Sequence, residues 1–450
     1  MPFIVVYSIA EMSMEDCSLG DWEADELENP CGRTPWVFNS FINELTVLGQ
    51  FDKTERESPW TDLKACIRSV VLMDGITSIH KRAFFEYRSL STVRIPNSVK
   101  CIGKRAFFYC ADLKSVVIPD SVATIGKDAF LGCYTAHTIN IPKSVTSINN
   151  QVFYDCDRLA SVVIPSSVTS IGKRAFEYCR ALTSVVIPNS VRSIGNEAFR
   201  ECGRLTSVTI PGSVETLGVM IFFGDDMLEL NVVGKNQNFK VVDGFLLDKD
   251  MTRIIWCSHE KSGCYEIPDT VKVLDRVVFG SHSKLTSIAL PSIVTKIESF
   301  EFGYCRQLET ITLPNTVESI SKYAFYDSGL KSITIPDSVT FIGKNAFKYC
   351  ISLEEIVLSN SLKSVGYCAF CHCESLLSVT FPDSVVDIAD YAFNSCDKLA
   401  SVTFSNSIES IGQGAFSLSN ALESIKIPKS VKLIGKCSFG CPNLKTVYVP

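Results

Sequence analysis

Hydrophobic and polar residues follow a pattern that recurs about every 23 residues along most of the chain. In the clearest copy the inward residues are Leu182, Val185 and Ile187. Ser184 and Val186 alternate with the last two, and a period of two predicts a short strand with one side in the core. Proline follows at position 188 and lacks the N–H that a central strand needs, so the strand is expected to end there.

After the proline, the pattern predicts a turn and a return to the core. Asn189–Ser190 has the chemistry of a turn. Val191 and Ile194, three residues apart, re-enter the core, and Gly195 permits a bend. Residues 198–202 hold an Ala-Phe pair and a cysteine, which favours a short helical turn packed inside. Each unit therefore has one apolar edge that it can bury only by stacking on its neighbours.

Proline and phenylalanine fix the register of this repeat. Thirteen of the eighteen prolines occupy the slot that ends the strand: Pro96, Pro119, Pro142, Pro165, Pro188, Pro211, Pro268, Pro291, Pro314, Pro336, Pro382, Pro428 and Pro450. Met73, Ser359 and Ser405 fill that slot without proline. A phenylalanine column accompanies it: Phe84, Phe107, Phe130, Phe153, Phe176, Phe199, Phe222, Phe279, Phe302, Phe325, Phe347, Phe370, Phe393, Phe416 and Phe439. We therefore predict about 17 stacked turns of about 23 residues, each a short strand plus a turn or short helical segment.

The unit Leu-x-x-Val-x-Ile-Pro-x-Ser-Val-x-x-Ile-Gly-x-x-Ala-Phe-x-x-Cys resembles the BspA-like leucine-rich repeat family over about residues 61–450. Cys31-Gly32, Trp36, 45–49 and Pro59-Trp60 resemble the β-rich lead-in of that family, and 238–246 resembles its β insert. The resemblance implies a leucine-rich-repeat solenoid that binds proteins, in many members at the cell surface, and that is not an enzyme. Many members carry a signal peptide or surface anchor, and neither is recognisable in this sequence.

These features divide the chain into five predicted parts. Residues 1–30 form an acidic, poorly ordered segment, and residues 31–66 form a β-rich cap. Residues 67–233 form the first half of the solenoid, 234–267 an expanded repeat with a β-hairpin-like insert, and 268–450 the second half. The sequence stops in a slot that ends a strand, so we expect either a fragment or an edge covered by another chain.

Charge argues against some classes of partner. The net charge is -6, yet residues 1–60 carry twelve acidic and three basic side chains, which leaves the rest at about +3. Nucleic-acid binding usually needs a concentrated basic stripe, so we expect no nucleic-acid partner. No stretch approaches the roughly 18 apolar residues of a membrane span, so none is expected.

The cysteines are numerous, and nine of them form a ladder in the repeat: Cys110, Cys133, Cys156, Cys179, Cys202, Cys305, Cys350, Cys373 and Cys396. Cysteine is often buried as a free thiol, so structural thiols are favoured, and a reducing compartment would suit them. Disulfides between adjacent rungs remain an alternative, since the expected spacing approaches disulfide geometry. Cys257 and Cys264 in the expanded repeat are a further possible pair.

Two patterns suggest metal or haem chemistry. Residues 368–373 hold three cysteines and a histidine in an order that matches haem attachment and includes a possible zinc cluster. Phe370 and Cys373, however, are core residues of that unit. Asp243, Asp248 and Asp250 could hint at calcium, but Asp243-Gly244 is first a hairpin signal. We therefore predict no metal and no cofactor.

No catalytic grouping emerges from the sequence either. The five histidines belong to separate units and lack a nucleophile or carboxylate at a recurring catalytic spacing: His80, His137, His259, His282 and His372. The repeated serines occupy turn and strand slots, and the repeated glycines are single bends that form no phosphate loop. The chain is predicted not to be an enzyme.

The outward strand position, two residues before each proline slot, is the candidate binding column. Valine and threonine dominate it, which suits any strand but also gives a flat, weakly charged surface for a partner. The departures from Val and Thr are the predicted protein-binding residues: Arg94, Asn140, Glu266, Lys426 and Tyr448.

The leading hypothesis is a binding solenoid with a protein or other macromolecular ligand on its strand face, for which the family resemblance implies a role in cell-surface adhesion. An intracellular scaffold is the first alternative, because no clear signal peptide is present. A structural protein that self-associates through its C-terminal edge is the second. The family resemblance favours the cell surface and the missing signal favours the cytoplasm, so the sequence leaves the compartment open.

Overall fold

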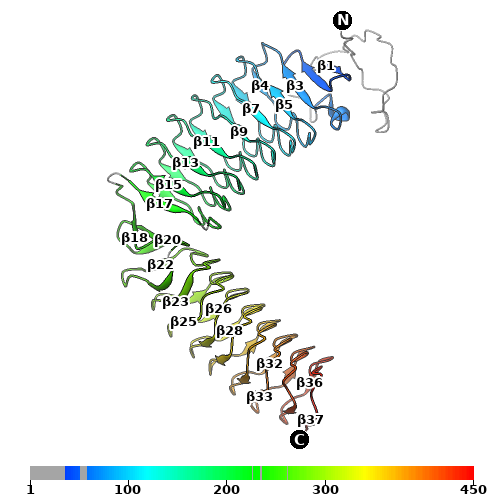
Figure 1. Ribbon diagram of the computed structural model, residues 1–450, viewed down its shortest axis with the longest axis vertical. Helices are drawn as coiled ribbons and strands as arrows, with labels where there is room; N and C mark the ends of the chain where they lie inside the picture. Colours follow the sequence, from blue (N-terminus) through cyan, green and yellow to red (C-terminus); the bar gives the residue numbers. More distant parts are fainter. Residues whose placement is uncertain (1–35, 51–57, 226, 234–235, 261, 450) are drawn as a thin grey trace. The chain divides into compact units, whose positions relative to one another are not determined.

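The computed structural model describes residues 36–50, 58–225, 227–233, 236–260 and 262–449 (Figure 1). The predicted acidic segment 1–30 and part of the predicted 31–66 cap lie outside these residues. The chain divides into two compact units, Met1–Val241 and Val242–Pro450. Both units are built from the same kind of turn, which has three sides: a long-strand side, a short-strand side and a turn side.

The long-strand side carries strands of two to five residues. In unit 1 they are β3 (Ser69–Leu72), β5 (Thr92–Arg94), β7 (Ser115–Val117), β9 (Thr138–Ile139), β11 (Ser161–Val163), β13 (Ser184–Val186), β15 (Ser207–Ile210) and β17 (Glu229–Val232). In unit 2 they are β21 (Gly263–Glu266), β23 (Leu285–Ala289), β25 (Thr310–Thr312), β27 (Ser332–Thr334), β29 (Glu355–Val357), β31 (Ser378–Thr380), β33 (Ser401–Thr403), β35 (Ser424–Lys426) and β37 (Thr446–Tyr448).

The short-strand side follows the proline turn, where Val191 and Ile194 re-enter the core. In unit 1 its strands are β4 (Ser78–Ile79), β6 (Cys101–Ile102), β8 (Thr124–Ile125), β10 (Ser147–Ile148), β12 (Ser170–Ile171), β14 (Ser193–Ile194) and β16 (Thr216–Leu217). In unit 2 they are β22 (Val273–Leu274), β24 (Lys296–Ile297), β26 (Ser319–Ile320), β28 (Phe341–Ile342), β30 (Ser364–Val365), β32 (Asp387–Ile388), β34 (Ser410–Ile411) and β36 (Leu433–Ile434).

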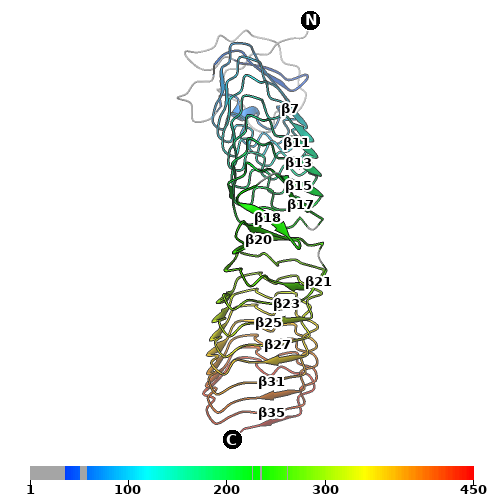
Figure 2. The ribbon, with the colours of Figure 1, turned by 90° about the vertical axis from the view of Figure 1, so that its left-hand side faces the viewer.

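The strands pair in parallel from one turn to the next, in the register of the repeat. Ser161 lies beside Ser184 on the long-strand side, and Ser170 lies beside Ser193 on the short-strand side. Figure 2 shows the long strands of unit 2 following one another from β21 to β35. Because side chains alternate, this register places equivalent residues of successive turns in columns.

The turn side is not helical. The only helix among the described residues is the 3-10 segment η1 (Thr61–Leu63). In a typical turn, Arg82 and Glu86 have φ of 62° and 60°, a left-handed conformation that a helix excludes. The N–H groups of Arg82, Phe84 and Glu86 donate to carbonyls of the next turn at 3.0, 2.7 and 2.6 Å. These bonds form a third ladder of hydrogen bonds between turns. The prediction of a turn is therefore confirmed on this side, and the alternative prediction of a short helical segment is wrong.

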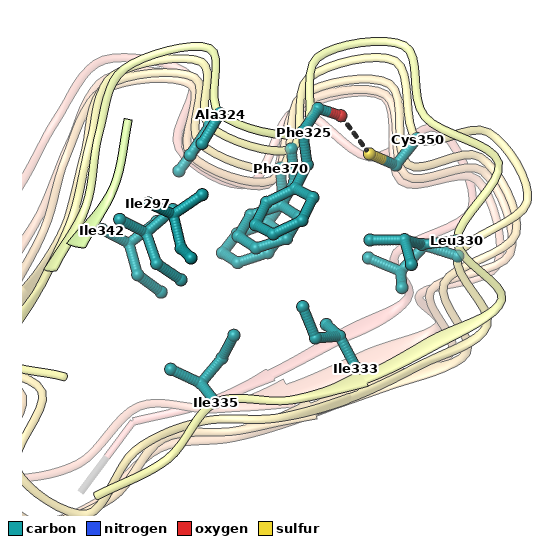
Figure 3. Close-up of a cluster of buried hydrophobic side chains, with 14 of the residues drawn as sticks. Ile297, Ala324, Phe325, Leu330, Ile333, Ile335, Ile342, Cys350 and Phe370 are labelled. Atoms are coloured by element: carbon teal, nitrogen blue, oxygen red, sulfur yellow. Dashed lines mark hydrogen bonds between the residues drawn. The ribbon is translucent and has the colours of Figure 1, made fainter. Parts of the chain in front are cut away.

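The core lies between the three sides. Figure 3 shows it in unit 2, where the long-strand side supplies Ile333 and Ile335, the short strands supply Ile297 and Ile342, and the turns supply Phe325. The phenylalanine rings stack along the turns, for example Phe325 on Phe347 with ring centroids 4.9 Å apart and an angle of 8°. The predicted phenylalanine column is therefore the centre of the core.

Two segments depart from the regular turn. Before the first turn, β1 (Trp36–Asn39) and β2 (Glu44–Val47) form an antiparallel hairpin, and β2 pairs in parallel with β3. In the expanded repeat, β18 (Phe239–Val242) leads through Asp243–Gly244 to β19 (Phe245–Asp248), which pairs antiparallel with β20 (Arg253–Cys257). The predicted fold class is confirmed: a solenoid of about 17 turns of about 23 residues, with a β-hairpin-like insert and almost no helix.

Candidate binding surface

The cysteine ladder is structural. All nine of its thiols are free and buried. Each Sγ–H in a regular turn donates to the carbonyl of the phenylalanine in the turn before, as Cys179 does to Phe153 at 3.2 Å and Cys350 does to Phe325 at 3.0 Å (Figure 3). Burial raises the pKa of Cys350 to about 12, so the reactive thiolate is suppressed. The thiol prediction is confirmed for this ladder, and the disulfide alternative is wrong.

The cysteines outside the ladder differ in their bonding state. No disulfide joins Cys257 to Cys264. Cys257 is buried, whereas Cys264 is exposed and its Sγ accepts a hydrogen bond from Ser287 at 2.8 Å. The proposed pairing of these two residues is therefore wrong. Cys66, which lies outside the ladder, is disulfide-bonded.

The haem and zinc pattern lies inside the core. Phe370 is fully buried and stacks between Phe347 and Phe393 at 5.0 and 4.9 Å. Cys373 is fully buried and bonds to the carbonyl of Phe347 at 3.3 Å. Within the described ranges, no group of three His, Cys, Asp or Glu side chains is placed to hold a metal ion.

Two of the three aspartates of the expanded repeat, Asp243 and Asp248, shape its turns. Asp243 and Gly244 have φ of 47° and 79°, which a two-residue hairpin loop requires. The Asp248 carboxylate accepts from the N–H groups of Thr252 and Arg253 at 2.6 and 3.0 Å, and from the Thr252 hydroxyl at 2.6 Å. These bonds hold the turn before β20, so this carboxylate is already occupied.

Two histidines that are 23 residues apart in sequence meet in the structure. The rings of His259 and His282 lie 3.8 Å apart between centroids, and both are buried. Burial and the neighbouring ring hold the pKa of His282 well below its ordinary value, so this ring is neutral. This pair was not predicted from the sequence, because the two histidines belong to separate repeat units.

The exposed strand side of unit 1 forms an uncharged surface, which we call the valine stripe. It consists of the outward residues of five neighbouring strands: Ser115, Val117, Thr138, Asn140, Ser161, Val163, Ser184, Val186, Ser207 and Thr209. Val117, Val163 and Val186 are 75%, 80% and 77% exposed. Such exposure is unusual for a β-branched apolar residue.

Charge and length define the limits of the valine stripe. Arg94 in β5 precedes it and Glu229 in β17 follows it, whereas the ten residues between are neutral. Five strands at a spacing of about 4.8 Å give a stripe about 19 Å long. Val163 and Val186 are adjacent in this column, and Asn140 separates them from Val117. Exposed apolar residues that lie next to one another mark interaction sites more often than isolated ones do.

Unit 1 contains two of the five residues predicted from sequence. Arg94 ends β5 and is exposed at one end of the valine stripe. Asn140 lies within the stripe, directly after β9. Its side chain both accepts from the N–H and donates to the carbonyl of Ile118, each at 2.7 Å. Asn140 therefore extends the strand pairing in place of backbone, which gives it a structural task.

Unit 2 contains the other three. Glu266 is exposed at the end of β21. Lys426 and Tyr448 are register partners on β35 and β37, so the structure brings this pair together. They line a groove of about 440 Å³ with Ser401 and Val402 of β33.

No helix in the described parts of the chain is long and apolar enough to cross a membrane.

One cavity was missed by the sequence analysis. It has a volume of about 250 Å³ and lies in unit 2 between β22 and β24. Glu298 and Glu301 are among its lining residues. They occupy slots that hold glycine and alanine, respectively, in most turns. These two departures from the repeat could have indicated the cavity from the sequence.

Comparisons with known proteins place the chain among repeat proteins. A family model described as "BspA type Leucine rich repeat region (6 copies)" matches residues 63–181, 101–229, 261–354 and 340–450. No protein with a curated functional description matches significantly.

Solved structures also resemble the chain. The pneumococcal vaccine antigen PcpA is 22% identical, with 91% of this chain and 94% of that chain covered and a TM-score of 0.51, a likeness in fold. A leucine-rich cell surface protein from Faecalibacterium prausnitzii is 25% identical, with 94% and 95% covered and a TM-score of 0.49. A leucine-rich repeat protein from Bacteroides ovatus is 24% identical, with 94% of each chain covered and a TM-score of 0.43.

Proposed function

Since the chain belongs to the BspA-type leucine-rich-repeat family, we propose that it is a non-enzymatic protein that binds another protein through the valine stripe of unit 1. The family match, which covers most of the chain, confirms the resemblance drawn from the sequence. Family and fold are typically non-enzymatic, and their usual role is to present a surface to a partner.

The observation that carries the proposal is the row of exposed valines. A valine that protrudes from a paired strand gains nothing from the core, and each one leaves apolar area in water at a cost of about 25 cal/mol per Å². The uncharged neighbours would let a partner cover the stripe without leaving charges unpaired. A protein surface with its own apolar row fits these properties, whereas nucleic acid would need basic residues.

The five residues singled out by sequence have different parts in this proposal. Arg94 would add a charged contact at one end of the stripe. Lys426 and Tyr448 would form a second contact in unit 2, because they line one groove. We give Asn140 a structural role, since its amide is bonded to Ile118. Glu266 remains a candidate on exposure alone.

Site-specific photo-cross-linking tests the proposal. A photoreactive amino acid would replace Val163 in the stripe or, as a matched control, Ala123, which is exposed just before β8. Both variants would be produced in cells of the source organism and irradiated, and adducts would be identified by mass spectrometry. We expect one dominant protein adduct from position 163 and none of that mass from position 123. Equal adduct patterns at the two positions would contradict the proposal.

The same experiment separates the alternatives. Protease treatment of intact cells before irradiation would remove the adduct if the protein acts in adhesion at the surface. Protection until lysis would favour an intracellular scaffold. An adduct with a second copy of this chain would instead favour the self-associating structural protein.

A further inference from the structure

The pairing of the short strands is interrupted in unit 2. Among the described residues, β22 pairs with β20, and a new sheet begins at β24 and continues to β36. On the long-strand side the same turns stay paired, because β21, β23 and β25 form one sheet. The turns of β22 and β24 therefore separate on one side only, and the cavity of about 250 Å³ lies between them.

The glycine slot is where successive turns normally approach most closely, although Asp275 fills it in the turn of β22 and its N–H still reaches the carbonyl of Ile254 at 2.9 Å. A Cβ added to Gly195 would lie 2.6 Å from the backbone nitrogen of Lys173 in the preceding turn, so the usual approach of two turns leaves no room for a side chain. Ser321 and Ala389 fill the slot in two other turns whose N–H groups still reach the preceding turn, at 2.9 and 3.2 Å, so those turns are spaced to admit a short side chain. Glu298 fills the slot at the interruption with a longer side chain.

A second interruption in unit 1 shows what this one lacks. The short strands also stop pairing between β8 and β10, where Asn149 fills the glycine slot. There the Asn149 amide donates to the carbonyl of Ile125 at 2.7 Å and replaces the missing backbone bond. A carboxylate such as Glu298 cannot donate, so it cannot close the gap in this way.

Glu301 makes the cavity chemically distinctive. It fills a slot that holds alanine in most turns, it is 6% exposed, and it lines the cavity. Oε2 accepts a hydrogen bond from the N–H of Val277 at 2.9 Å. Oε1 is buried and, within the described part of the chain, has no hydrogen-bond partner. A buried carboxylate oxygen without a donor is costly and is a feature that a ligand would relieve.

The other charged groups at the cavity are already engaged or lie at its mouth. Arg253 holds Asp275 through two bonds of 2.6 and 2.8 Å. Lys296 lies 3.5 Å from Glu298. Lys272 is exposed. Glu301 is therefore the buried acid that remains available in the cavity.

The cavity walls near Glu301 are apolar. Leu290, Val294, Ile297 and Phe302 are buried and line it, and Ile293 and Val273 lie exposed beside it. An aliphatic stem that ends in a positive group would match both features, because the stem would contact the apolar wall and the charge would lie beside the Glu301 carboxylate.

We propose that the cavity between β22 and β24 is a docking site for a basic side chain, lysine or arginine, of a partner protein, with Glu301 as the residue that receives the charge. This site is in unit 2, goes beyond the valine stripe and does not depend on it. The buried acid also links binding to pH. Burial raises the pKa of Glu301 to about 7, although the hydrogen bond from the N–H of Val277 opposes the rise. A bound cation favours the ionised form, so binding is expected to tighten as pH rises from 6 to 8.

Ligand-observed NMR with n-butylammonium, which has the shape of a lysine side chain, tests the site on the full chain. 1-Butanol is the neutral probe. Glu301→Gln keeps an oxygen for the N–H of Val277 and removes the charge, and Glu318→Gln changes an exposed acid outside the cavity. We expect at least tenfold weaker n-butylammonium binding in Glu301→Gln, no change in Glu318→Gln, and no effect of either on 1-butanol.

The pH profile gives an independent readout. The ionised fraction of a group with a pKa of about 7 rises roughly tenfold between pH 6 and pH 8. The wild-type dissociation constant should therefore fall roughly tenfold over the same range. The Glu301→Gln profile should be flat. Equal binding of n-butylammonium to wild type and Glu301→Gln would overturn the proposal.

A peptide distinguishes a protein partner from a free amine. An acetylated, amidated pentapeptide with a central lysine should bind at least as well as n-butylammonium, and its acetyl-lysine form should not bind. If n-butylammonium binds and the lysine peptide does not, the site takes small free amines and the protein-partner proposal fails. Loss of binding at the valine stripe would leave these results unchanged, so the two proposals fail separately.

Discussion

Phe176→Ala tests the assignment of the phenylalanine column to the core. The Phe176 ring is fully buried on the turn side of unit 1. It stacks between Phe153 and Phe199 with centroids 5.3 Å away on both sides, at angles of 19° and 4°. Its backbone carbonyl also accepts the thiol of Cys202 at 3.2 Å. The substitution would keep that carbonyl and remove the ring alone.

The expected loss follows from these contacts. Replacing a buried phenylalanine by alanine in a core costs about 3–5 kcal/mol, the larger value applying where the site cannot collapse. Rings on both sides are held by their own neighbours in the column, so collapse is limited. Each stacked pair contributes about 0.5–1.5 kcal/mol beyond area burial. We therefore expect a loss of about 4–5 kcal/mol.

Urea unfolding followed by circular dichroism measures this loss. Val186→Ala in the next turn is the control, since Val186 is 77% exposed and the change should stay within about 0.5 kcal/mol. Each turn of a solenoid is stabilised mainly by its neighbours, so the unfolding transition of the Phe176 variant should also broaden. Similar losses in the two variants would refute the inside-outside assignment of the repeat.

Three further predictions concern other parts of the structure. Gly195→Ala should destabilise by about 1–3 kcal/mol in urea, because its Cβ would lie 2.6 Å from the nitrogen of Lys173; Gly203→Ala, whose Cβ would be 3.8 Å from the nearest atom, should be close to neutral, and the reverse order would contradict the close approach of the turns. Glu301 has a folded pKa of about 7 against an ordinary 4.5, so the folded state holds the proton more tightly and stability should fall as pH rises from 4.5 to 7; Glu301→Gln should gain about 3 kcal/mol relative to wild type over that range, and a constant difference would contradict the burial of a protonated acid. A thiol reagent should modify Cys264 and Cys437, which are exposed, before any ladder cysteine; Cys264→Ser should remove a rapidly reacting thiol and Cys179→Ser should not, and rapid loss of signal in the Cys179 variant would contradict its burial.

The fold could be predicted from the sequence because each position of the repeat requires a particular type of residue. Val185 and Ile187 alternate with exposed residues, and proline at position 188 ends the pairing, so strand and register both follow. The turn side was harder to predict. Residues such as Arg174 and Tyr178 adopt φ of 56° and 62°, which their side chains do not reveal. The ladder between turns holds them there, and that ladder is a contact between distant residues.

The candidate surfaces were predicted less completely. The outward column was identified by alternation, and the structure adds that Asn140, one of the predicted binding residues, also bonds to Ile118. The pairing of His259 with His282 depends on how the expanded repeat meets the next turn, which spacing alone does not give. Glu298 and Glu301 could have been noticed, because both break a slot of the repeat. The repeat was defined by the dominant residue of each column, so single departures such as Glu298 and Glu301 were not considered.

Binding of the cross-linked partner to a Val163→Lys, Val186→Lys double variant tests the central claim most directly. Lysine at two exposed strand positions should leave the fold intact, as urea unfolding would verify, and a Thr312→Lys, Thr334→Lys variant of unit 2 is the matched control. The valine stripe predicts that the first variant loses at least tenfold in affinity while the second binds as wild type does. Unchanged affinity in the first variant, or equal losses in both, would contradict the account.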